Sequence, residues 1–253
     1  MIVRSVEEGW RVVFHAAHGL LAQDLASHVD IGDQLPYWPL TQVAIGNHDD
    51  AKQQFRPGKR TYVTDVGVPK DFTLMSMSSE ERVKDARSQI WEACKKHRWI
   101  GLLVSLHNDS LYRNEPVADE MQSLLDDERK RRSEVLNDLE VTTDDLQASY
   151  DWMSWCDRCS LILSGKDVPA MQRRVEIITT SQGQRYDLQQ DKSGILHIEP
   201  WPFRERDFKV SIEARTLRQL SYQDDAELAD ALRHSSVHDE IFSFQSADNT
   251  KII

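Results

Sequence analysis

Cysteine is scarce in this chain, with three among 253 residues. An odd and small number of cysteines does not describe a disulfide framework. Long apolar runs are also missing, because no stretch reaches the roughly eighteen apolar residues of a membrane-spanning helix. Residues 1–10, MIVRSVEEGW, lack the apolar core of a signal peptide. These absences predict a soluble cytoplasmic protein without a membrane partner.

Positive charge is in deficit, with 31 Lys and Arg against 42 Asp and Glu and a net charge of −11. Binding to a nucleic-acid backbone requires a basic face, so this balance argues against nucleic acid as the main partner. Apolar residues make up 40% of the chain and include seven Trp. Such a composition supports a well-packed core in one large domain, or in one domain with a small annex.

The hydrophobic pattern changes twice along the chain. Residues 1–14 predict two short strands around the turn EEG. Helical spacing then dominates, and the helices are expected over 16–35, 39–50, 78–97, 99–112, 117–139 and 143–163. After SGKDVP the segments RRVEIITT, QRYDLQQ, GILHIEP and FKVSIEART alternate and predict an antiparallel meander, followed by a short helix over 224–233 and the apolar stretch EIFSF.

This pattern predicts a mainly α (α+β) fold. A helical core would cover residues 16–165. Residues 1–15 and 166–253 would form a β-rich appendage, a small antiparallel sheet packed on the core as part of a single structural unit.

Imidazoles and carboxylates mark several of the predicted helices. His18 opens the first helix, His48 and Asp49 end the second, His107 lies on the apolar helix, and Asp157 lies on the last helix before the sheet. Helical bundles build metal sites from side chains on facing helices. This mixture of ligands suits a divalent ion, namely Mn, Fe, Co, Ni, Zn or Mg, rather than a thiolate zinc site.

Polar neighbours extend this candidate site. Asp50 follows the His-Asp doublet and could orient a water, while His107 could assist as an acid or base. A further set could bind an anionic substrate, namely His15, Lys52, Arg56, Lys59, Arg60 and Arg158. Arg158 could instead neutralise its neighbour Asp157.

The order His, His-Asp, His, Asp over helices resembles the HD-domain phosphohydrolase superfamily. The resemblance implies a helical bundle in which His18, His48, Asp49 and Asp157 hold a divalent metal. In it, His107 corresponds to the extra histidines that some members use for a second metal or for substrate phosphate.

A second resemblance covers nearly the whole chain. The stretches HDD, TDVGVPKDF, LLVSLHNDSLY, CDRCSLIL and EPWPF are similar to a bacterial family known only as domain of unknown function 3891. Ala51 stands where that family usually has Gly, and the spacing of HAAH leaves the first ligand open between His15 and His18.

Structural interpretations compete with these functional ones. Cys156 and Cys159 form a C-x-x-C pair, but no second pair completes a zinc site, so core packing accounts for them best. His234 and His238 are expected on the surface, and Trp201–Phe203 is expected to pack the sheet on the helices. Asp71 and Phe72 could bring the preceding loop back over the site as a cover.

The sequence thus predicts a metal-dependent hydrolase acting on a phosphoester or phosphoanhydride of a small anionic molecule such as a nucleotide. This prediction is compatible with one or two bound ions. It is also compatible with a homodimer. Two alternatives stay open. One is an HD-like sensor module that has lost catalysis, with which the change at Ala51 is compatible, and the other is a di-iron oxygenase.

Overall fold

The computed structural model describes residues 1–32, 35–49, 61–112 and 118–247. Its helices are α1 (His15–His28), α2 (Trp38–Asn47), the short 3-10 turn η1 (Phe72–Leu74), α3 (Ser79–Lys96), α4 (Arg98–Tyr112), α5 (Asp119–Leu139), α6 (Thr143–Ser164) and α7 (Asp225–His234). Its strands are β1 (Ile2–Val6), β2 (Gly9–Val13), β3 (Arg174–Thr179), β4 (Arg185–Gln190), β5 (Leu196–Glu199), β6 (Asp207–Leu217) and β7 (Ser236–Gln245). The chain is therefore an α+β protein, as predicted.

Local signals place most helix ends close to their expected positions, but α1 ends at His28 rather than near residue 35, because the backbone becomes extended at Val29. Ser78 and Glu81 form a capping box at the start of α3, and Thr142 and Asp145 form one at the start of α6. Each box satisfies backbone N–H groups that a helix start leaves free. Helix α4 is buried from Trp99 to Asp109, as its almost wholly apolar sequence predicts.

The sheet corrects one expectation. Its strand order is β1-β2-β6-β7-β5-β4-β3, so β7 lies between β6 and β5. β7 pairs antiparallel with β6 along ten residue pairs, and it meets β5 in parallel at Leu196 and Phe244. The meander therefore ends at β5, and the sheet is mixed rather than antiparallel. The apolar stretch EIFSF lies in β7 and pairs with β6. Which strands become neighbours in a sheet depends on contacts between distant segments rather than on local sequence.

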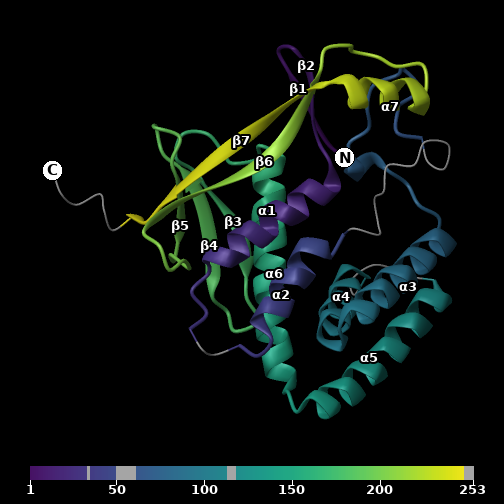
Figure 1. The fold of residues 1–253 in the computed structure, drawn as a ribbon, viewed down its shortest axis with the longest axis vertical. Helices are drawn as coiled ribbons and strands as arrows, with labels where there is room; N and C mark the ends of the chain where they lie inside the picture. The colour runs from purple at the N-terminus through teal and green to yellow at the C-terminus, as the bar shows by residue number, and fades with distance from the viewer. Residues whose placement is uncertain (33–34, 50–60, 113–117, 248–253) are drawn as a thin grey trace.

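Helix α6 runs through the middle of the molecule, with β3, β4 and β5 on one side and α3, α4 and α5 on the other (Figure 1). One apolar cluster joins the two parts: it includes Leu25 of α1, Leu103 of α4, Trp155 of α6 and Ile212 of β6. The ring of Phe203 lies 5.7 Å from that of Trp155, so the WPF segment packs the sheet on the helices as predicted.

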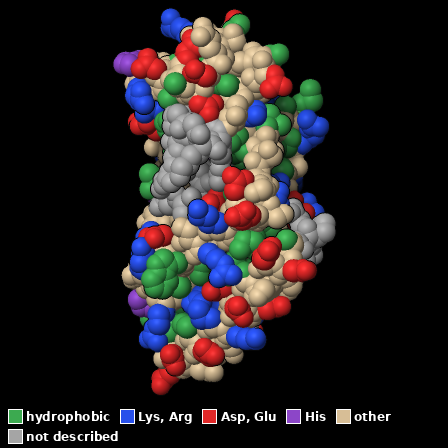
Figure 2. Space-filling model, turned by 90° about the vertical axis from the view of Figure 1, so that its right-hand side faces the viewer, with side chains coloured by type: hydrophobic (Ala, Val, Ile, Leu, Met, Phe, Trp, Pro, Cys, Tyr) green, Lys and Arg blue, Asp and Glu red, His purple; other side chains and the backbone are tan. Residues whose placement is uncertain are grey.

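Charges of both signs intermix on the face that carries α3 and α5 (Figure 2). This mixture is typical of a solvated face, which the run DDERKRR in α5 predicts. Within the described residues, no helix is both long enough and apolar enough to cross a bilayer.

Candidate metal centre

Two histidines lie on the first turn of α1. β2 ends at Val13 and α1 begins at His15, so the chain passes directly from the sheet into the site. His15 is 5% exposed and His18 is fully buried. The Nδ1–H of His18 donates to the carbonyl oxygen of His15, three residues earlier. This bond assigns the proton to Nδ1 and leaves the lone pair of His18 on Nε2.

His48 is held in the same way at the end of α2. Its Nδ1 lies 2.7 Å from the carbonyl oxygen of Ile45, again three residues earlier. The buried ring therefore directs Nε2 away from its own helix. Asp49 is the next residue. The C-terminal end of α2 therefore supplies both an imidazole and a carboxylate, as predicted.

Two glycines let α1 and α2 approach closely at this point. A Cβ on Gly19 would lie 2.6 Å from the carbonyl oxygen of Gly46, and a Cβ on Gly46 would lie 2.1 Å from Oε1 of Gln23. Gly19 neighbours His18, and Gly46 lies two residues before His48. Sequence reasoning missed this pair, although two glycines inside helices beside candidate ligands are a usable signal.

Four ligand atoms from three helix regions converge. Oδ1 of Asp157 lies 3.0 Å from Nε2 of His48 and 3.3 Å from Nε2 of His18. Oδ2 of Asp49 lies 3.6 Å and 3.8 Å from the same two nitrogens. The four predicted ligands therefore lie close together, although they are spread over most of the helical part of the sequence. His18, His48 and Asp157 form one group whose ligand atoms all lie within 4.8 Å of one another.

The spacing of these atoms fits a divalent cation. Bonds of about 2.0–2.2 Å to nitrogen and oxygen separate neighbouring ligand atoms by roughly 3.0–3.6 Å in octahedral or tetrahedral geometry. The four nitrogen–oxygen distances, 3.0 to 3.8 Å, lie in or just above this range. With both Nδ1 atoms bonded to carbonyls, the Nε2 lone pairs face carboxylate oxygens. Only a proton or a cation between them makes that contact favourable.

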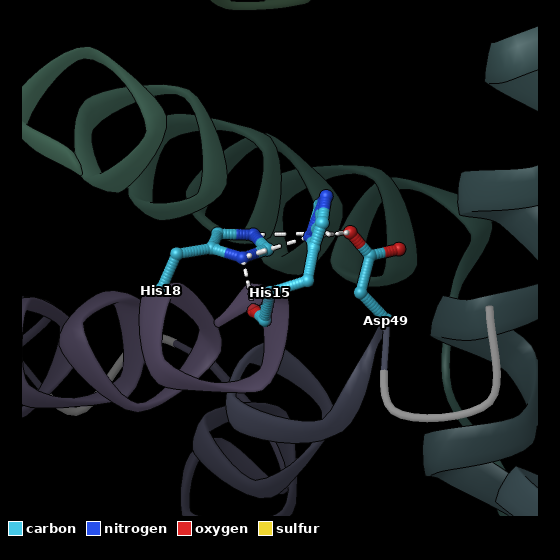
Figure 3. Close-up of side chains that lie close together, drawn as sticks. All are labelled: His15, His18 and Asp49. Carbon is cyan, nitrogen blue, oxygen red and sulfur yellow. Dashed lines mark hydrogen bonds and ion pairs between the residues drawn. The ribbon is translucent and has the colours of Figure 1, made fainter. Parts of the chain in front are cut away.

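His15 and His107 flank the four atoms. Nδ1 of His15 lies 3.5 Å from Oδ2 of Asp49, and Figure 3 shows the imidazoles of His15 and His18 extending from α1 toward that carboxylate. His15, His18 and Asp49 form one group that could hold an ion. His48, Asp49 and His107 form another, with their ligand atoms within 4.8 Å of one another. Of His15 and His18, it is His18 that also contacts Asp157.

Nε2 of His15 has no hydrogen-bond partner within the described residues, although it is buried. Such a buried, unpartnered nitrogen costs free energy unless a ligand or water reaches it. This nitrogen therefore supports the interpretation that the cluster binds a ligand.

The surroundings of His48 and His15 shift the pKa values of these two buried imidazoles in opposite directions. Burial disfavours the charged form of His48, but the carboxylates of Asp49 and Asp157 outweigh it and raise its pKa to about 9. Burial and the neighbouring His18 lower the pKa of His15 to about 3. Burial also opposes ionisation of Asp157, yet His48 and His18 hold its pKa well below the usual value. These shifts favour a protonated His48 beside an ionised Asp157 at neutral pH.

One described residue of the predicted set, Arg158, does not reach this centre. Arg158 is exposed, and Asp157 pairs with His18 and His48, so the alternative that Arg158 neutralises Asp157 is not what the structure shows. The remaining members of the predicted set lie outside the described residues, namely Asp50, Lys52, Arg56, Lys59 and Arg60.

Two aromatic rings close the sides of the cluster. The ring of Phe72 meets that of His15 edge to face at 4.6 Å, which places η1 against the site. Asp71 accepts hydrogen bonds from the N–H groups of Val3 and Thr73 and so fixes this turn to β1. Tyr150 of α6, which sequence reasoning did not select, lies 6.2 Å from His107 between ring centroids.

The other candidates are structural. Cys156 and Cys159 are fully buried, and burial raises the pKa of both thiols, which keeps them protonated. His234 and His238 are exposed at the surface, as expected. Neither set contributes to the groups of possible metal ligands found among the described residues.

The fold and this cluster together define an α+β protein with a buried histidine–aspartate centre. A family model described as "Protein of unknown function (DUF3891)" matches residues 1–219, so the chain belongs to this family. No curated protein and no solved structure matches the chain.

Proposed function

We propose that this protein is a metal-dependent hydrolase that cleaves a phosphoester or phosphoanhydride bond in a small molecule such as a nucleotide. The observation that carries the proposal is the convergence of His18, His48, Asp49 and Asp157 at nitrogen–oxygen distances of 3.0 to 3.8 Å. The ligand order and its setting on α1, α2 and α6 support a relation to HD-domain phosphohydrolases.

A divalent cation at such a site lowers the pKa of a bound water and polarises a phosphoryl oxygen. The mixed donors suit Mn, Fe, Co, Ni, Zn or Mg, and the flanking His15 and His107 offer ligands for a second ion. The carbonyl oxygens of His15 and Ile45 fix the rings of His18 and His48, so that both Nε2 atoms are presented together.

His107 is the residue best placed to hold or move a proton. One of its ring nitrogens lies within 4.8 Å of the ligand atoms of His48 and Asp49. Its ring also lies 5.2 Å from that of His48 between centroids. A histidine has the pKa range for acid–base work near neutral pH.

The direct test combines metal analysis with a substrate screen. Protein purified without chelators is assayed for bound metal and for hydrolysis of phosphomonoesters, phosphodiesters and nucleotides with Mn, Co, Ni or Mg. We expect metal-dependent turnover that Asp157→Asn abolishes together with metal binding, because the amide supplies no charge. Asp144→Asn, on the exposed first turn of the same helix, is the matched control and should keep both.

Failure of the chain to bind any of these metals would overturn the proposal. Metal binding with ligand-induced thermal shifts but no turnover would replace it with a sensor function. Oxygen consumption by an iron-loaded form would replace it with oxygenase chemistry.

A further inference from the structure

A second cleft lies on the opposite side of α6 from the histidine–aspartate centre. Asp157 faces His18 and His48, whereas Trp155 contacts Tyr186 of β4 and Phe203. The cleft lies between α6, the segment after α1 and the turn that joins β3 to β4, and its volume is about 380 Å³. This volume falls within the usual range for small-ligand pockets.

Three aromatic rings form the wall of this cleft. The centroids of Trp152, Trp155 and Tyr186 lie 5.8 to 6.1 Å from one another, and the rings are tilted by 54° to 79°. Trp152 and Tyr186 are partly exposed, which leaves large apolar surface open to a ligand. The faces of such rings carry negative electrostatic potential and attract cations.

The charges at the cleft have one sign. Asp30 and Asp151 line it, and no Lys, Arg or His is among its described lining residues. Asp151 is fixed in place, because Oδ2 accepts from the N–H and Oγ–H of Ser181 at 3.0 and 2.6 Å and Oδ1 accepts from Gln147 at 2.9 Å. The same bonds hold the β3–β4 turn against α6. An anion is therefore disfavoured here, and a cation is favoured.

We propose that this cleft binds a small alkylated ammonium compound. Its alkyl groups pack on Trp152 and Tyr186, and its charge lies near Asp30 and Asp151. The proposal is independent of the hydrolase assignment, because the cleft shares no ligand residue with the metal centre.

Choline is the probe, and 3,3-dimethylbutan-1-ol is its uncharged counterpart of the same shape. Ligand-observed NMR titration of the full chain should show saturable choline binding at least about tenfold tighter than binding of the neutral alcohol. Trp152→Leu should weaken choline binding about tenfold or more. Trp91→Leu is the matched control, because Trp91 is 65% exposed on α3, and it should leave binding unchanged.

Gln182→Lys gives a second test that does not disturb the core, because Gln182 lies exposed on the β3–β4 turn at the cleft. The added positive charge should repel choline and weaken its binding, while circular dichroism reports an unchanged fold. The absence of saturable choline binding, equal binding of the neutral alcohol, or indifference to both variants would each overturn the proposal.

Discussion

Helix α4 carries two buried polar clusters that differ in how their charges are satisfied. Toward α5, Asp109 accepts from Arg129 at 2.6 Å and from Arg132 at 3.2 Å, and Arg132 also donates to Ser105 at 2.8 Å. Toward α2 and α6, His107 borders a cluster in which imidazole lone pairs face carboxylates. In the first cluster each positive group meets a negative or neutral acceptor, and in the second the imidazoles of His18 and His48 face two carboxylates.

This difference distinguishes a structural network from a candidate ligand site. Arginine cannot lose its proton, so the cluster around Asp109 is complete without any added component. The imidazoles of the second cluster can exchange a proton for a metal ion, because Nε2 binds either one. Both clusters contain buried polar side chains, and the identity of the donors and acceptors tells them apart.

Removing one group from the candidate metal centre should have the largest effect of the changes considered. His48→Ala should lower the affinity for divalent metal by about a hundredfold or more, because it deletes a ligand that contacts two carboxylates. Metal content measured by mass spectrometry and hydrolytic activity should both fall. His234→Ala, an exposed histidine on α7, should retain both; an equal loss in the two variants would contradict the assignment.

Removing Asp109 should have the next largest effect, on stability rather than on metal. Asp109→Ala leaves the buried Arg132 without its carboxylate and should lower the free energy of unfolding by about 3–5 kcal/mol. Urea denaturation measures this loss. Asp126→Ala removes an exposed partner of Arg129 and should cost about 0.5 kcal/mol or less. Loss of metal from folded Asp109→Ala protein would show that the two clusters are not separate.

The pH dependence of the metal-free protein should reveal the proton at His48. The folded-state pKa is raised from 6.5 to about 9, so the stabilisation is fully present below pH 6.5 and is lost as the pH rises through 9. The loss should be on the order of 3 kcal/mol. Unfolding measured at pH 6.5 and 9.5 should show this slope, and His48→Gln should flatten it. An unchanged slope in that variant would assign the proton elsewhere.

A smaller effect is expected where α1 and α2 meet. Gly19→Ala places a Cβ 2.6 Å from the backbone oxygen of Gly46, so the helices must separate. We expect a loss of about 1–3 kcal/mol in stability, together with weaker metal binding. Leu20→Ala, which changes an exposed neighbour on the same helix, should alter neither quantity. Metal affinity that survives in Gly19→Ala would show that the close approach is not needed for the centre.

The sequence by itself determined the local structure and the candidate ligands. Apolar spacing, capping residues and turn residues act over a few positions, so the helices and strands lie near their predicted places. The four candidate ligands could be selected because imidazoles and carboxylates on apolar helices are unusual. The basic residues of the 50–60 segment remain predictions from sequence alone.

Only the tertiary structure decided which groups meet. The insertion of β7 between β6 and β5, the packing of Gly19 on Gly46, the contact of Phe72 with His15 and the aromatic cleft beside α6 all join distant segments. Such contacts depend on how whole elements pack, which no local pattern encodes. The separation of Asp109 from the metal centre is of the same kind, because two residues on one helix turn face different neighbours.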